Sequence, residues 1–99
     1  MVLENHSGFM SKIKIRLFAN FREFTKTSEI EIEGDTVQEI LERICERFKG
    51  LEYILFKHGK LQPFVNIFLN GENLPGSDGL DKSLHHGDEI AIFPPVSGG

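Results

Sequence analysis

The sequence predicts an α+β fold in which one main helix covers one face of a mixed sheet of four to five strands. Residues 12–18 and 29–33 alternate charged and apolar side chains, which is typical of strands with one buried face. Residues 36–49 carry a long apolar stripe at helical spacing. Two further apolar segments, 64–69 and 89–93, follow as strands. One amphipathic helix between two pairs of strands indicates a β-grasp roll.

The composition is that of a single globular domain. The chain has 99 residues, of which 39% are hydrophobic and 26% are charged. Its net charge of −4 argues against nucleic acid or an anionic membrane as a partner, because both require a basic face. No apolar run approaches the roughly 20 residues that span a bilayer. The single cysteine, Cys45, excludes an intramolecular disulfide and fits a reducing compartment, so we expect a cytoplasmic protein.

The first two strands are expected to pair as an antiparallel hairpin. In residues 12–18 the inward side chains are apolar and the outward ones are basic, except for Phe18, which shares the outward face. The three glutamates of 29–33 would lie opposite the basic residues, and opposite charges favour such cross-strand pairs. We expect the intervening segment, 19–28, to be a connecting loop.

The main helix has clear start and stop signals. Thr36 and Glu39 form a capping-box pattern at its beginning, and Gly50 follows where a C-terminal cap glycine belongs. The apolar stripe consists of Val37, Ile40, Leu41, Ile44 and Phe48. Cys45 lies at the edge of this stripe, and no basic cluster surrounds it to lower its pKa. We therefore interpret Cys45 as a small buried hydrophobe.

The segment that follows the helix is harder to assign. The apolar residues of 51–63 could extend the helix or cover one end of the sheet. The third strand, 64–69, is apolar on both faces except for Asn66. Asn70-Gly71 is a strong hairpin signal and predicts a brief return strand over 72–74.

The last strand, 89–93, leads directly into the tail Pro94-Pro95-Val96-Ser97-Gly98-Gly99. Because this strand is apolar, we expect it at the centre of the sheet. The prolines stiffen the exit from the strand, and glycine lets the end pass where a side chain would clash. The expected organisation is a disordered N-terminal extension over 1–11, a β-grasp domain over 12–93 and a flexible Gly-Gly tail over 94–99.

No internal active site is indicated. His85 and His86 are adjacent in sequence and tend to point apart, and no third ligand has a suitable spacing to them, so we expect no metal site. No nucleophile–histidine signature or phosphate-binding glycine motif is present in the sequence. Chemistry is therefore expected at the α-carboxylate of Gly99. A carboxylate is ionised at neutral pH and is a poor electrophile, so a partner that uses ATP must activate it.

The end of the chain resembles that of one known family. It reads Gly87-Asp88-Glu89-Ile90-Ala91-Ile92-Phe93-Pro94-Pro95-Val96-Ser97-Gly98-Gly99. This ending is similar to the C-terminus of the small, sulfur-carrier subunit of molybdopterin synthase. Residues 13–24 and Val65-Asn66 also resemble that family, and the matching places in the first of these segments are Phe18, Ala19, Arg22 and Glu23.

The resemblance implies a ubiquitin-like β-grasp fold and a sulfur-carrier function. Gly99, preceded by Gly98, would be adenylated by an E1-like adenylyltransferase that uses ATP, and then converted to a thiocarboxylate. The tail would insert into the large subunit of molybdopterin synthase and donate sulfur to the molybdopterin dithiolene in molybdenum cofactor biosynthesis. The chain would be the non-catalytic subunit and bind no cofactor itself. The resemblance places the partner-binding residues at Phe18, Arg22, Leu69, Phe93, Pro94, Pro95 and Val96.

The same tail permits other functions. Gly-Gly β-grasp proteins also carry sulfur for tRNA thiolation or modify lysines as ubiquitin-like modifiers, and a third alternative is an interaction module whose tail is inert. The sulfur carrier of thiamine synthesis also ends in Gly-Gly but usually lacks the Phe-Pro-Pro stem, which makes it a weaker match. Segments 51–63 and 71–82 are longer than a minimal member of the family needs, which would suit a different partner.

Overall fold

The computed structural model describes residues 11–62, 65–74 and 79–93. The expectations for the tail over 94–99, and for all of the N-terminal extension except Ser11, concern residues outside this part of the chain. The elements in order are β1 (Lys12–Leu17), α2 (Ala19–Thr25), β2 (Glu29–Glu33), α3 (Val37–Arg47), α4 (Glu52–Leu55), β3 (Phe56–Lys57), β4 (Lys60–Leu61), β5 (Asn66–Leu69), β6 (Glu72–Asn73) and β7 (Glu89–Phe93).

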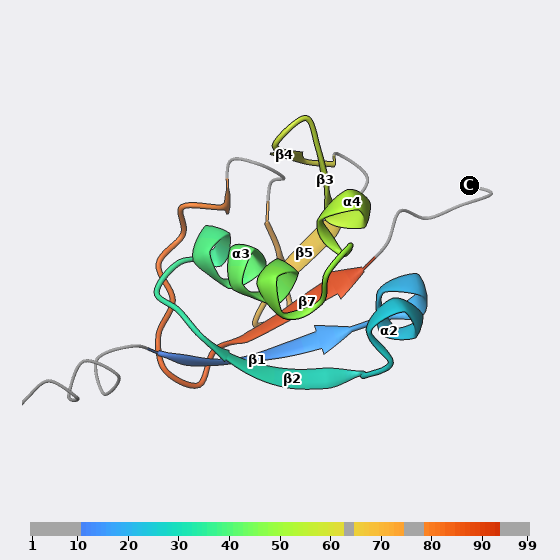
Figure 1. Cartoon of the computed structure of the whole chain (residues 1–99). Helices are drawn as coiled ribbons and strands as arrows, with labels where there is room; N and C mark the ends of the chain where they lie inside the picture. The colour runs from blue at the N-terminus through green and yellow to red at the C-terminus, as the bar shows by residue number, and fades with distance from the viewer. Residues whose placement is uncertain (1–10, 63–64, 75–78, 94–99) are drawn as a thin grey trace, which may run out of the picture.

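The predicted α+β architecture is confirmed. Five strands form one mixed sheet in the order β2-β1-β7-β5-β6, and α3 lies across one face of it (Figure 1). Strands β1 and β7 are parallel, whereas the other neighbouring pairs are antiparallel. The core forms between α3 and the inner face of the sheet. This is the β-grasp arrangement, with the last strand at the centre as predicted.

The N-terminal hairpin is antiparallel and pairs opposite charges, as predicted. Lys12 lies opposite Glu33, Lys14 opposite Glu31 and Arg16 opposite Glu29, the opposite-charge pairing that the sequence indicates. The alternate side chains of β1 point inward and are almost completely buried. A one-residue slip would bring the charged set into the core, so burial of one face fixes this register.

The prediction of a loop over residues 19–28 is wrong, because Ala19–Thr25 form helix α2. The helix buries only Phe21 and Thr25, a single pair at i and i+4. The Oγ1 atom of Thr25 donates a hydrogen bond to the carbonyl of Phe21 at 2.9 Å. Phe24 is 44% exposed and lies outside this stripe. Two turns with one buried pair are too short to show a helical period in the sequence.

Helix α3 begins with the predicted cap. The Thr36 side chain accepts a hydrogen bond from the amide of Glu39 at 3.2 Å. The Glu39 carboxylate in turn accepts from the amide of Asp35 at 2.8 Å, one residue earlier than in a standard capping box. This hydrogen bond, with help from Arg43, holds the pKa of Glu39 below its usual range despite some desolvation. No helix in the described part of the chain is long and apolar enough to cross a membrane.

The cap gives a direct stability prediction. We expect Thr36→Ala to lower the free energy of unfolding by about 1 kcal/mol, because the amide of Glu39 loses its side-chain acceptor. Urea denaturation measures the change. Thr36→Ser keeps the hydroxyl and is the control, and equal destabilisation by both variants would contradict the capping role.

The segment after α3 forms structure of its own. A turn at Gly50, with φ +95°, separates α3 from the short helix α4. The β3–β4 hairpin follows, and Leu51, Leu55 and Leu61 are buried in the core. Of the two alternatives for this segment, covering one end of the sheet is therefore correct. The Asn70-Gly71 hairpin between β5 and β6 is also confirmed, since both turn residues have positive φ.

Candidate functional site

The tail is attached to the central strand of the sheet. Strand β7 hydrogen-bonds to β1 on one side and to β5 on the other. Because β1 and β7 are parallel, both end at the same edge, and α2 begins there directly after β1 (Figure 1). The tail therefore begins at a fixed point beside α2. The roles predicted for residues 94–99, including Gly98 and Gly99, concern residues outside the described ranges.

Three phenylalanines meet where β7 ends, on the face of the sheet opposite α3. The rings of Phe18 and Phe93 are stacked, with centroids 4.3 Å apart and planes 4° from parallel. The ring of Phe68 meets Phe93 edge to face at 5.2 Å. All three side chains are half-buried by one another and by the sheet. We call Phe18, Phe68 and Phe93 the aromatic patch.

The placement of Phe18 and Phe93 on the outer face follows the sequence alternation. The partner-binding role that the resemblance gives to Leu69 does not agree with the structure, which buries this residue. Leu69 is only 7% exposed and lies opposite Ile90 in the core. Phe68 takes the outer position. The useful signal is Asn66, the polar residue of this strand, because residues two apart share a face. Since Asn66 marks the outer face of β5, Phe68 must lie on that face too.

Arg22 lies in α2, one helical turn from the patch. Its amide donates to the carbonyl of Phe18 at 3.4 Å, and the residue is exposed. The resemblance counts Arg22 and Phe18 together among the partner-binding residues, whereas the helix that connects them is not predicted from the sequence. The result is a cationic residue on a regular element beside the exit of the tail.

Charged side chains continue the outer face away from the tail. The Nε atom of Arg16 lies 3.3 Å from a carboxylate oxygen of Glu89 and 3.8 Å from one of Glu29. These side chains are about 40–50% exposed, so the ion pairs stabilise the fold by about 1 kcal/mol or less. In the sheet register Ala91 lies between Arg16 and Phe68, so a small side chain separates the charged residues from the aromatic rings. The face can dock a partner surface with an apolar centre and a polar border.

The histidines have structural contacts within the turn that precedes β7. The amide of His85 donates to the carboxylate of Asp88 at 2.7 Å. The Nδ1 atom of His86 accepts from the amide of Lys12 at 3.3 Å. Partial burial alone would raise the pKa of Asp88, but the hydrogen bonds from His85 and Asn70 and the nearby His85 charge hold it below its usual range. Within the described ranges, no three histidine, cysteine or acidic side chains gather where they could hold a metal ion.

Cys45 is half-buried beside two carboxylates. Burial raises the pKa of its thiol from 9.0 to about 11, and the charges of Glu52 and Glu42 add to the effect. The thiolate is the nucleophilic form of cysteine, so the folded chain suppresses its reactivity at neutral pH. The sequence predicts a buried side chain at this position, whereas the structure leaves Cys45 half-buried, packed against the core as a small side chain.

The raised pKa can be checked by alkylation. At pH 8 we expect iodoacetamide to modify Cys45 about a hundredfold more slowly in the folded chain than in urea, because the thiolate fraction falls tenfold per pKa unit. Mass spectrometry follows the reaction, and the urea-unfolded chain is the control. Equal rates would show that the fold leaves the thiol accessible and easily ionised.

A sequence model of the ThiS family matches residues 15–99. The putative sulfur carrier protein of Archaeoglobus fulgidus is 39% identical over 88 residues, which cover 88% of this chain and 98% of that protein. The molybdopterin synthase sulfur carrier subunit of Haemophilus influenzae is 33% identical over 90 residues, covering 88% and 99%.

The fold is shared with a solved structure. The small archaeal modifier protein 1 of Methanosarcina acetivorans is 37% identical, with a TM-score of 0.82 and coverage of 93% of this chain and 100% of that one. The family match includes β7, the strand that contributes Phe93 to the aromatic patch and leads into the tail. The chain therefore belongs to the ThiS family and has the ubiquitin-like β-grasp fold of its small sulfur carriers.

Proposed function

We propose that this sulfur carrier works through a thiocarboxylate at Gly99 and donates sulfur to form the molybdopterin dithiolene in molybdenum cofactor biosynthesis. The main support is the position of β7. It is hydrogen-bonded on both sides and ends at the aromatic patch, where the Gly-Gly tail begins. The domain thus provides a docking surface at the base of a slender reactive end.

The chemistry takes place in partner proteins. An E1-like adenylyltransferase binds the tail, and the Gly99 carboxylate attacks the α-phosphate of ATP, which releases pyrophosphate. A hydrosulfide-level sulfur nucleophile then attacks the acyl carbon and displaces AMP, which leaves a thiocarboxylate. The thiocarboxylate sulfur bonds to the acceptor as an acyl thioester, and water cleaves the acyl–sulfur bond, which leaves the sulfur on the acceptor and a carboxylate on Gly99. The chain supplies the acyl group and the docking surface, whereas ATP binds to the partner.

One relative and the stem of the tail support the acceptor that we propose. The relative from Haemophilus influenzae is named as a subunit of molybdopterin synthase, and this chain has the Phe-Pro-Pro stem that resembles that family. We therefore propose that the tail enters the large subunit of the synthase, with the aromatic patch and Arg22 against that subunit. The compartment that we propose is the cytoplasm.

Intact mass spectrometry of the chain purified from its native host tests the thiocarboxylate. We expect a population heavier by one oxygen-to-sulfur exchange, localised to the C-terminal peptide. Deleting the gene should also abolish the activity of a molybdenum enzyme in the same host. A thiocarboxylate without loss of that activity would leave the carrier function standing and reject the molybdenum pathway.

A second candidate is a ubiquitin-like modifier that is joined through Gly99 to lysines of other proteins. The similarity to a small archaeal modifier protein over nearly the whole chain favours it. Proteolysis of host proteins would then release lysine peptides that carry a C-terminal remnant of this chain. Remnants that disappear in the deletion strain would establish this role.

A further inference from the structure

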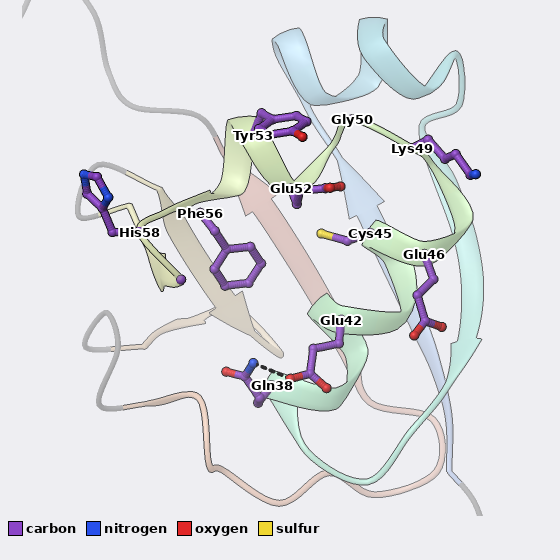
Figure 2. Close-up of a pocket in the computed structure, with 11 residues that line it drawn as sticks. Gln38, Glu42, Cys45, Glu46, Lys49, Gly50, Glu52, Tyr53, Phe56 and His58 are labelled. Carbon is purple, nitrogen blue, oxygen red and sulfur yellow. Dashed lines mark hydrogen bonds between the residues drawn. The ribbon is translucent and has the colours of Figure 1, made fainter.

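A groove lies on the helix side of the sheet, away from the aromatic patch. It is formed by one side of α3, by α4 and by the tip of the β3–β4 hairpin (Figure 2). The lining residues that carry the argument are Glu42, Cys45, Glu46, Glu52, Tyr53 and Phe56. Neither the proposed sulfur transfer nor the family resemblance gives this groove a role.

The floor of the groove is apolar. Cys45 on α3 and Phe56 at the start of β3 are both half-buried, and their side chains turn toward the space between the helix and the hairpin (Figure 2). The thiol is uncharged at neutral pH, because burial raises its pKa to about 11. Tyr53 stands at the rim and is 78% exposed, the most exposed large hydrophobic side chain in the described residues.

The walls of the groove are acidic. Three carboxylates line it, those of Glu42, Glu46 and Glu52. The basic side chains in the lining are fewer, namely the ammonium group of Lys49 and the imidazole of His58. Glu42 accepts a hydrogen bond from a neighbouring glutamine. None of the three glutamates forms an ion pair in the part of the chain that the structure describes. The charges of Glu52 and Glu42 both act on the Cys45 thiol, so two carboxylates flank the apolar floor.

We propose that this groove docks an arginine-bearing segment of a partner protein. The aliphatic stem of the arginine would lie over Cys45 and Phe56, and its guanidinium would reach Glu42 and Glu52. Arginine fits better than lysine, because its planar guanidinium can bind a carboxylate through two hydrogen bonds and stack on the ring of Tyr53. The match is one of charge and of shape: a long apolar stem with a cationic end.

The groove and the aromatic patch can be occupied at the same time. Helix α3 covers the inner face of the sheet, whereas Phe18, Phe68 and Phe93 lie on the outer face. A partner docked at the groove therefore leaves the rings of the aromatic patch uncovered. The proposal rests on the groove alone. If the groove binds no partner, the sulfur chemistry proposed for Gly99 is unaffected. If Gly99 carries no sulfur, the groove proposal is equally unaffected.

Titration of the full-length, isotope-labelled chain with a penta-arginine peptide tests the proposal by amide chemical shifts at near-physiological ionic strength. We expect saturable shifts confined to α3, α4 and the β3–β4 hairpin. Combining Glu42→Gln, Glu46→Gln and Glu52→Gln should weaken binding about tenfold. Tyr53→Ala should weaken it about threefold.

Matched variants separate the groove from general charge attraction. The triple variant Glu23→Gln, Glu31→Gln and Glu72→Gln removes the same charge from exposed positions elsewhere and should leave the affinity unchanged. Phe93→Glu, on the other face, should also leave it unchanged. The proposal would be overturned if both triple variants weakened binding equally, or if the peptide shifted amide signals over the outer face. Equal affinity for penta-lysine, or the absence of saturable binding, would overturn it as well.

Discussion

Deletion of Gly99 is expected to reduce sulfur transfer to background while the domain keeps its stability. Removing one residue withdraws the reacting carboxyl group by about 3.5 Å. A misplacement of only about 1 Å can cost a hundredfold in rate, because the reacting atoms must be held in line. We therefore expect a loss of at least about a thousandfold in adenylation. Pyrophosphate release with the activating partner and ATP measures the rate.

The deletion has a simple control. Ser97→Ala preserves the length of the chain and its terminal glycines, and we expect it to retain most of the activity. Thermal unfolding should be the same for both variants and for the native chain, because none of the described core residues is changed. If the chain without Gly99 is adenylated at the native rate, Gly99 is not the reacting residue.

Phe93→Glu is expected to weaken binding of the activating partner by about thirtyfold. The substitution breaks the stack with Phe18 and the edge contact with Phe68, and it places a carboxylate at the centre of the aromatic patch. A buried aromatic at the centre of an interface typically contributes about 2 kcal/mol or more. Calorimetric titration of the purified partner gives the change in Kd.

The fold should survive this substitution, because Phe93 is only half-buried and lies outside the core cluster. Loss of two aromatic contacts costs about 1–3 kcal/mol of stability. Unfolding of the Phe93 variant would place Phe93 in the core, and an unchanged Kd would remove the patch from the interface.

Local signals explain why most of the sheet was predictable. The alternation in β1 and β2, the Thr36 cap and the Asn70-Gly71 turn each depend on a few neighbouring residues. The central position of β7 follows from its apolar sequence. In each case burial of one face and local backbone chemistry favour the same structure, which is when sequence patterns predict well.

The missed features depend on contacts between distant segments. Helix α2 contributes one residue, Phe21, to the hydrophobic core, and the ring of its Phe24 packs against Gly50. In strand β5 the polar Asn66 is the only sequence signal for the outer face, and pairing with β7 places Leu69 on the core side. The groove combines three elements whose juxtaposition no local pattern encodes. Tertiary packing therefore decided each of these features.

The parallel pairing of β1 with β7 has a consequence for the synthesis of the protein. The sheet joins the first strand of the domain to the last, with β7 between β1 and β5. A nascent chain that stops before β7 lacks the strand that joins the two halves of the sheet, and it lacks the core residues Ile90 and Ile92. We therefore expect stable folding only after translation has passed β7, so that the folded domain carries the strand from which the reactive tail extends.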